Sequence, residues 1–117
     1  MENEINYEAL GARIREARLK KHISQEKLSD TVNVSVRYMS SIELAKSKIG
    51  LQTLVAIANA LDTTIDVLLY DSSPLLVSKY DSEAKSVLSD CTAEEKQFLI
   101  DLMKHAKEDL RNNIQSK

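Results

Sequence analysis

The sequence predicts an all-α protein in which a domain of five short helices, residues 1–70, precedes a short C-terminal helical segment. The 117 residues include only two glycines, one proline and 4% aromatic residues, a composition that favours helices over a β-sandwich or barrel. The hydrophobic content of 43% suffices for one core. In addition, helix-start signals recur along the chain and apolar residues repeat at helical spacing.

One helix-start signature occurs three times in the first half of the chain. In each case a residue able to cap a helix follows an apolar residue, and a second apolar residue stands five positions after the first. This is the spacing of a hydrophobic staple around an N-cap. The three instances are Ile23-Ser24 with Leu28, Val34-Ser35 with Met39, and Ile49-Gly50 with Leu54. Separately capped starts favour several short helices over one long helix.

The helices of the domain follow from these starts and from the apolar spacing. We expect them at about Tyr7–Lys21, Gln25–Val32, Val36–Leu44 and Leu51–Leu61, with the fifth after Thr64. The first places Leu10, Ile14 and Ala17 on one face. The apolar residues of the last two are Leu51, Leu54, Ile57, Ala58 and Leu61, all expected to be buried, and then Ile65, Leu68 and Leu69.

The clearest break in the pattern is the segment Asp71–Pro74. Proline cannot continue a helix, and the residue before it prefers extended geometry. We therefore expect a linker at residues 71–81, followed by a C-terminal segment at residues 82–117. A short helix at Ser82–Ser89 is expected there, with Ala84, Val87 and Leu88 buried.

A longer helix is expected at about Ala93–Asn113, because Thr92 and Glu95 have the spacing of a capping box. Its apolar stripe is too wide and too long for a helix standing alone in water, so it needs a partner surface. The predicted dimer or partner interface consists of Phe98, Leu99, Leu102, Met103, Ala106 and Leu110.

Charge is unevenly distributed, although the net charge is only −2. Residues 1–48 contain nine Lys and Arg against seven acids, whereas the remainder contains seven against eleven. The first part therefore carries +2 and the second −4. This asymmetry permits a basic, DNA-facing edge on an acidic body.

Several classes of protein find no support in the sequence. No run of 18 apolar residues would span a membrane, and the acidic N-terminus is unlike a secretory signal. Cys91 is the single cysteine, which fits a reducing compartment such as the cytoplasm. His22 and His105 stand in no metal-binding pattern, and the chain has no glycine-rich phosphate loop. We expect no metal, no cofactor and no enzymatic activity.

The segment Gln25–Leu44 has the pattern of two short helices joined by a tight turn. Ser29 is small where the two helices would approach closely, and Asn33 stands where the turn needs a left-handed residue. The apolar positions that would join the helices and pack them on a third are Leu28, Val32, Val34, Met39 and Ile42. The second helix is then placed to project its N-terminal side chains into a DNA major groove.

From Leu10 to about Tyr70 the chain resembles the XRE (Cro/phage-repressor) family of DNA-binding domains. The matching pieces are Leu10–Ile14 with Arg18, Ser24-Gln25 with Leu28, Val34-Ser35 with Ser41–Glu43, Leu54–Leu61, Thr64–Asp66 and Leu68-Leu69. The resemblance implies a five-helix, lambda-repressor-like fold. The chain has Ser29 where the family usually has Ala, Asn33 and Ala45 where it usually has Gly, and Ile49 where it often has Pro.

The resemblance also implies roles for individual residues. Base edges would be contacted by Val36, Arg37, Ser40 and Ser41, and phosphates by Ser24, Gln25, Ser35, Tyr38, Lys46 and Lys48. Arg37 suits a bidentate contact with guanine, the alternative being contact with phosphate or solvent alone. Tyr38 either binds a phosphate or packs on the fourth helix. Arg18 and Glu43 would form a partly buried structural ion pair.

Two functional hypotheses follow. The first is a sequence-specific transcriptional regulator in the cytoplasm, associated with the nucleoid, which acts as a homodimeric repressor on a two-fold symmetric duplex operator. The second is a protein-interaction module, antitoxin-like or an adaptor, whose C-terminal helix binds another protein such as an antagonist. The two differ in what the C-terminal segment does.

Overall fold

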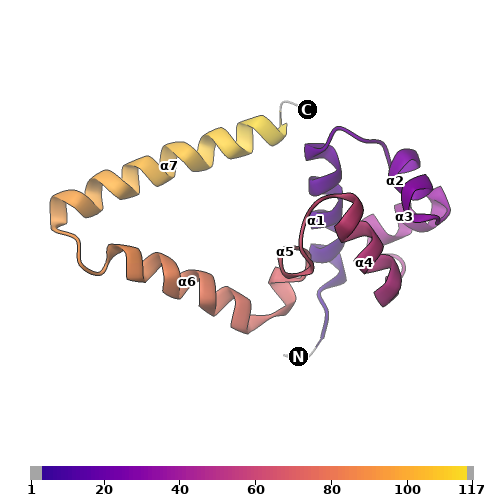
Figure 1. Cartoon of the computed structure of the whole chain (residues 1–117), viewed down its shortest axis with the longest axis horizontal. Helices are drawn as coiled ribbons and strands as arrows, with labels where there is room; N and C mark the ends of the chain where they lie inside the picture. The colour runs from indigo at the N-terminus through magenta and orange to yellow at the C-terminus, as the bar shows by residue number, and fades with distance from the viewer. Residues whose placement is uncertain (1–3, 116–117) are drawn as a thin grey trace. The chain divides into compact units, whose positions relative to one another are not determined.

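The computed structural model describes residues 4–115, and over this range the chain is all-α without strands, which confirms the predicted fold class. The elements are α1 (Tyr7–Lys20), α2 (Gln25–Val32), α3 (Val36–Glu43), α4 (Leu51–Ala60), α5 (Ile65–Leu68), the 3-10 turn η1 (Tyr70–Ser72), α6 (Pro74–Leu88) and α7 (Ala93–Gln115) (Figure 1). The chain divides into two compact units after Pro74. Within the described range no helix combines the length and apolarity needed to cross a bilayer.

The first unit has a closed hydrophobic core. Its α1 packs against α3 and α5, and its α2 packs against α3 and α4. The buried apolar residues are Leu10, Ile14, Leu28, Met39, Ile42, Leu54, Ile57, Ala58, Leu61 and Leu68. The residues of all three expected staples contribute to the core, since Leu28, Met39 and Leu54 are buried and Ile23, Val34 and Ile49 pack against the core. The local signature at each helix start therefore also fixes a core contact.

The helix starts are capped by side chains. Asn6, Ser24, Ser35 and Thr64 each accept a hydrogen bond from the backbone N–H three residues later. Such a bond satisfies one of the N–H groups that a helix leaves unpaired at its first turn. Gly50, at the start of α4, has no side chain to do this. Capping thus fixes the starts of α1, α2, α3 and α5.

The first four helices also end in the same way. His22, Asn33, Ala45 and Asp62 have positive φ angles between 52° and 61°. After each, the next backbone N–H bonds the carbonyl five residues back, as from Val34 to Ser29 at 2.9 Å and from Lys46 to Ser41 at 2.8 Å. This is the Schellman arrangement, which pairs carbonyls that a helix end leaves free. Glycine is the usual residue at this position, and here none of the four is glycine.

One expectation about the core is wrong. Leu51 is 76% exposed, although its spacing places it on the same face as Ala58. It is the first residue of α4, where no described element covers the helix end. Ala17 of α1, expected on the buried face, is half-buried against the core.

The second unit begins earlier than expected. The predicted linker at residues 71–81 is wrong, because η1 ends at Ser72 and α6 begins at Pro74, with Ser73 alone between them. Proline is well suited to the first position of a helix, where its missing N–H and fixed φ carry no cost. The break expected at Pro74 is therefore a helix start, and residues 74–81 belong to a helix.

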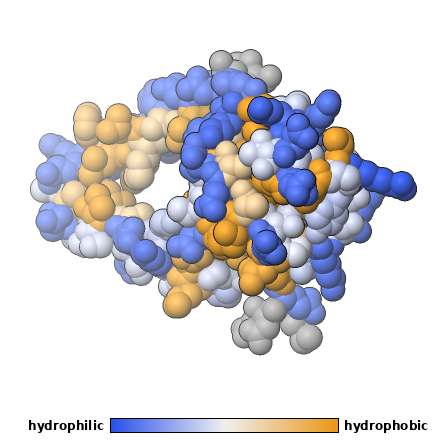
Figure 2. All heavy atoms as spheres, turned by 45° about the vertical axis from the view of Figure 1, so that its right-hand side comes forward, coloured by the Kyte–Doolittle hydropathy of each residue, from blue (hydrophilic) through white to orange (hydrophobic). Residues whose placement is uncertain are grey.

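The expected burial of Ala84, Val87 and Leu88 is also wrong for the single chain, since Val87 is 65% exposed and none of the three is buried. No described side chain of α6 or α7 is buried. Figure 2 shows hydrophobic residues at the surface among hydrophilic ones. The start of α7 is well formed, because Thr92 and Glu95 bond each other's backbone N–H at 2.8 and 3.2 Å. The backbone N–H of Thr92 lowers the pKa of Glu95.

Candidate nucleic-acid interface

Helix α3 has one buried face and one open face. Met39 and Ile42 are buried at 0% and 2% exposure, because they pack into the core. Val36 and Arg37, at the start of the helix, are exposed, and neither a hydrogen bond nor an ion pair is formed by the Arg37 side chain within the described chain. The remaining two predicted base contacts, Ser40 and Ser41, are half-buried. The N-terminal half of α3 therefore presents an unpaired guanidinium beside an apolar side chain.

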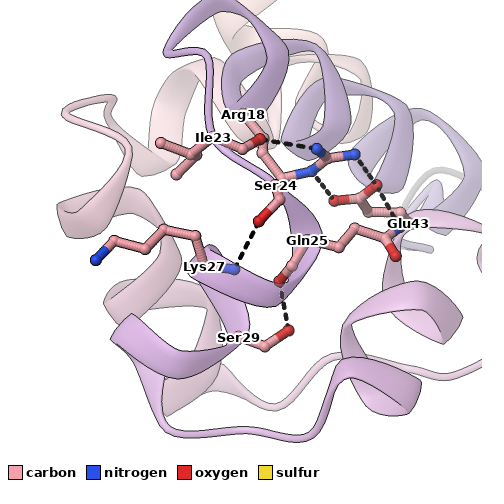
Figure 3. A network of polar contacts seen from close by, with 7 residues as sticks. All are labelled: Arg18, Ile23, Ser24, Gln25, Lys27, Ser29 and Glu43. Atoms are coloured by element: carbon pink, nitrogen blue, oxygen red, sulfur yellow. Dashed lines mark hydrogen bonds and ion pairs between the residues drawn. The ribbon is translucent and has the colours of Figure 1, made fainter.

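A buried polar network joins the first three helices (Figure 3). The guanidinium of Arg18, in α1, donates to both carboxylate oxygens of Glu43, in α3, at 2.8 and 3.0 Å. Its remaining nitrogen donates to the carbonyl of Ile23 at 2.9 Å. Gln25, at the start of α2, donates its amide to Glu43 at 3.0 Å. One carboxylate is thus held by two other helices.

The network fixes α3 relative to α1 and α2. The side chains of Arg18 and Glu43 are 8% and 1% exposed, so both charges are largely removed from water. Buried charges are tolerated when they are paired and their remaining donors are satisfied, as they are here. Among residues 31–61, Glu43 is the only acid, against Arg37, Lys46 and Lys48. Because Arg18 neutralises Glu43, the exposed charge of this stretch is positive.

Gly11 is a positioning residue that the sequence analysis missed. A Cβ built on Gly11 would lie 2.5 Å from the carbonyl oxygen of Ile42 and 2.6 Å from that of Glu43. The backbones of α1 and the end of α3 therefore touch at this point. A glycine inside a helix costs up to about 1 kcal/mol relative to alanine, and such a cost indicates a packing reason. The presence of a glycine inside a predicted helix was therefore the signal in the sequence that could have identified Gly11.

Tyr38 connects α3 to the start of α4. Its hydroxyl accepts a hydrogen bond from the backbone N–H of Gly50 at 3.3 Å, and its ring packs against the core. The packing alternative for Tyr38 is therefore present in the structure, while the hydroxyl oxygen stands beside the exposed α3–α4 loop. Ser35 and Ser24 both act as N-caps, bonding the backbone N–H of Tyr38 and Lys27.

The α3–α4 loop carries both predicted phosphate-binding lysines. Lys46 is exposed, and its side chain pairs with no described residue. Lys48 is exposed too, and its ammonium nitrogen lies 5.9 Å from the centre of the Tyr7 ring. The loop that follows the C-terminal end of α3 therefore presents two exposed cations.

The predicted interface of α7 is largely open. Phe98, Leu102 and Leu110 are 67%, 54% and 59% exposed, and Met103 is 49% exposed. Leu99 is half-buried, and Ala106 is exposed. Apart from Leu99, the residues of this stripe are exposed in the described chain. Over the same residues, no three His, Cys, Asp or Glu side chains gather in a group that could hold a metal ion.

Comparison with known proteins gives matches among family models and solved structures. Residues 14–68 match the helix-turn-helix family model. None of the curated proteins matches the chain. Two structures of the clp gene regulator ClgR from Corynebacterium glutamicum are similar. One has 27% identity and a TM-score of 0.53, covering 56% of this chain and 86% of that chain. The other has 24% identity and a TM-score of 0.56, covering 74% and 93%.

The third similar structure is the SinR protein/SinI protein complex. Its matching chain has 25% identity and a TM-score of 0.52, and the match covers 85% of this chain and 98% of that chain. This match therefore extends beyond the helix-turn-helix segment at residues 14–68.

Proposed function

The domain at residues 14–68 belongs to the XRE-type helix-turn-helix family of DNA-binding transcriptional regulators, and from this premise we propose that the chain is a homodimeric repressor. It binds a two-fold symmetric operator in duplex DNA, with α3 in the major groove. In this proposal it acts in the cytoplasm, on the nucleoid.

The open half of α3 is the observation that carries the proposal. Arg37 is exposed and unpaired on the first turn of the helix, while the opposite face is held by the core and by the network around Glu43. A guanidinium in this position can make a bidentate contact with O6 and N7 of guanine. Val36 beside it is suited to a thymine methyl group, and Ser40 and Ser41 complete the proposed base contacts.

Phosphates would be bound on both sides of α3. Lys46 and Lys48 supply cations after the helix, and the capped start of α2, at Ser24 and Gln25, offers backbone N–H groups. Ser35 and Tyr38 lie at the start of α3 itself. Because Gln25 is already bonded to Glu43, a phosphate held at the start of α2 would be coupled to the position of α3.

A dimer is proposed because one helix reads only a few base pairs. Two recognition helices about 34 Å apart, one turn of DNA, reach two half-sites and give enough contacts for specificity. The exposed apolar stripe of α7 is the surface proposed to join the two copies. Burying it would remove side chains such as Phe98 and Leu102 from water.

Selection of bound sequences from random duplex DNA tests the function. Wild-type protein should enrich a two-fold symmetric sequence, with an affinity that falls steeply as salt rises. Arg37→Ala should relax the preference at one base position and weaken binding there by about 1–3 kcal/mol. The matched control is Lys46→Ala, which should weaken all sequences nearly equally and flatten the salt dependence. Identical preference profiles for wild type and Arg37→Ala would remove the role given to Arg37.

A second candidate function is favoured by the same stripe on α7. The SinR protein is found in a complex with the SinI protein, and the match to that structure extends over 85% of this chain. The stripe would then hold a different protein, and binding would control access to DNA. Analytical ultracentrifugation of the full chain separates the two uses. A chain that is monomeric at micromolar concentration contradicts the homodimer and leaves the partner role.

A further inference from the structure

If the chain binds DNA as proposed above, Tyr7 has a place in that binding. One stripe of α1, at positions 7, 11, 14 and 18, faces α3 and the loop after it. Gly11 touches the carbonyls at the end of α3, Ile14 is fully buried, and Arg18 binds Glu43. Tyr7 stands one turn before Gly11 on the same stripe, because residues four apart in a helix share a face. The stripe therefore continues past α3 to the loop that carries Lys48.

The contact between Tyr7 and Lys48 joins residues 41 positions apart in the chain, and it places the ammonium 5.9 Å from the ring centre. A cation within about 6 Å of an aromatic face is attracted by the ring's quadrupole. The ring is held in place, because Tyr7 is half-buried against the core at a helix start capped by Asn6. The ammonium is held on one side only, so its outward N–H donors remain available to another acceptor.

We propose that Tyr7 is a positioning residue for DNA binding, which holds the Lys48 ammonium toward the DNA backbone by a cation–π contact. A lysine side chain loses rotamer entropy when it is fixed. The ring restricts the ammonium before DNA arrives, so part of that loss is already incurred in the free protein. Among the described residues no aromatic ring lies over the Lys46 ammonium, so Lys46, in the same loop, serves as the internal comparison.

The test measures the affinity of the full chain for a duplex oligonucleotide enriched by selection, at several salt concentrations. Tyr7→Leu should weaken binding about twofold to fivefold, the range of an exposed cation–π contact, while Tyr7→Phe keeps the ring and the affinity. In the Lys48→Gln background, Tyr7→Leu should have no further effect. In the Lys46→Gln background, Tyr7→Leu should weaken DNA binding by the same factor as in the wild-type background.

A second measurement needs neither DNA nor the leucine variant. The ε-methylene protons of Lys48 should be shifted upfield in the proton NMR spectrum by the ring of Tyr7, and those of Lys46 should not. An equal loss of affinity from Tyr7→Leu in all three backgrounds would show a merely structural role and overturn the proposal, as would unshifted Lys48 protons. A wild-type chain without salt-dependent affinity for any duplex would instead overturn the proposed function, and the positioning role with it.

Discussion

The N-terminal unit buries its apolar side chains, and α7 displays them. Ile14, Leu28 and Met39 are 0% exposed, whereas Phe98 and Leu102 are more than half exposed. The first unit also satisfies its polar groups internally, by caps, by Schellman ends and by the network at Glu43. From this comparison we expect the first unit to be stable by itself, and we propose that the second unit needs a partner surface.

The largest effect is expected from Glu43→Ala. The substitution leaves the guanidinium of Arg18 buried without its partner and removes the acceptor of Gln25. Breaking a buried pair in this way costs about 3–5 kcal/mol. Urea unfolding followed by circular dichroism measures the loss of unfolding free energy.

The control for Glu43→Ala is the double variant Arg18→Met, Glu43→Leu, which removes both charges and should cost much less. Hydrogen exchange of α7 amides should be the same in all three proteins. A loss below about 1 kcal/mol for Glu43→Ala would contradict the stabilising role of the network in the first unit.

The next effect concerns the second unit. Leu102→Asp places a charge in the exposed stripe of α7, so it should leave the unfolding of the first unit unchanged and weaken self-association. Burial of one leucine contributes about 1.5–3 kcal/mol, so association should weaken by at least tenfold. Sedimentation equilibrium measures this change.

Asn112→Asp is the matched control for Leu102→Asp, since Asn112 is an exposed polar residue of the same helix and the charge change is equal. Unchanged association for both variants would show that the copies join elsewhere or do not join. In wild-type protein, amide protection in α7 should rise with protein concentration.

A smaller loss is expected from Gly11→Ala. The added methyl meets two backbone carbonyls of α3 at less than 3 Å, so the helix must shift. Overpacking of this kind costs about 1–3 kcal/mol of unfolding free energy. Gly50→Ala is the comparison, because a Cβ there has nothing within 4 Å. An equal loss of unfolding free energy from the two substitutions would mean that α1 and α3 can move apart at Gly11 at little energetic cost.

The smallest effect on the unfolding free energy is expected from the ion pair between Arg13 and Asp71, near the end of the first unit. The guanidinium of Arg13 pairs with Asp71 and lowers the pKa of that carboxyl below its ordinary value of 3.8. Such a carboxylate stabilises the fold at neutral pH, and this contribution is lost as the pH falls below about 4 through the lowered pKa. Both side chains are about a third exposed, so the pair contributes less than about 1 kcal/mol.

Asp71→Asn should therefore lower the unfolding free energy slightly at pH 7, and the difference from wild type should vanish in strong acid. Thermal unfolding over a series of pH values checks this. A difference that grows on acidification would have the wrong sign for a carboxylate with a lowered pKa.

The predictable parts of the fold are those that depend on residues close together in the sequence. Staples and caps lie within six positions, so the starts of α2, α3 and α4 were predicted at the correct residues. Asn33 was expected to be left-handed, and it has φ of 60°. Pro74 was misinterpreted because proline both stops and starts helices, and only the flanking structure decides between the two.

The candidate site likewise has some features that the local sequence predicts and others that depend on contacts between distant residues. The open and buried faces of α3 follow from its apolar spacing, and the pairing of Arg18 with Glu43 was expected from the resemblance to the family. The contacts of Gly11 with α3 and of Tyr7 with Lys48 join residues more than 30 positions apart. No local pattern specifies them, because they depend on how α1 lies along α3. Leu51 was wrongly expected to be buried for a related reason. The apolar spacing predicts on which face of the helix a residue lies, but it does not predict how far the neighbouring elements extend over that face.

The turns after α1, α2, α3 and α4 have a consequence for the unfolded chain. Each uses a left-handed residue with a side chain where glycine would be relaxed, and neither of the two glycines has a positive φ. An L-residue such as Ala45 is strained in that conformation by about 1–2 kcal/mol. It also samples fewer conformations than glycine when unfolded, so it loses less entropy on folding. The four turns therefore have two opposing effects on stability: the left-handed conformation strains the folded state, while the side chains lower the conformational entropy of the unfolded chain.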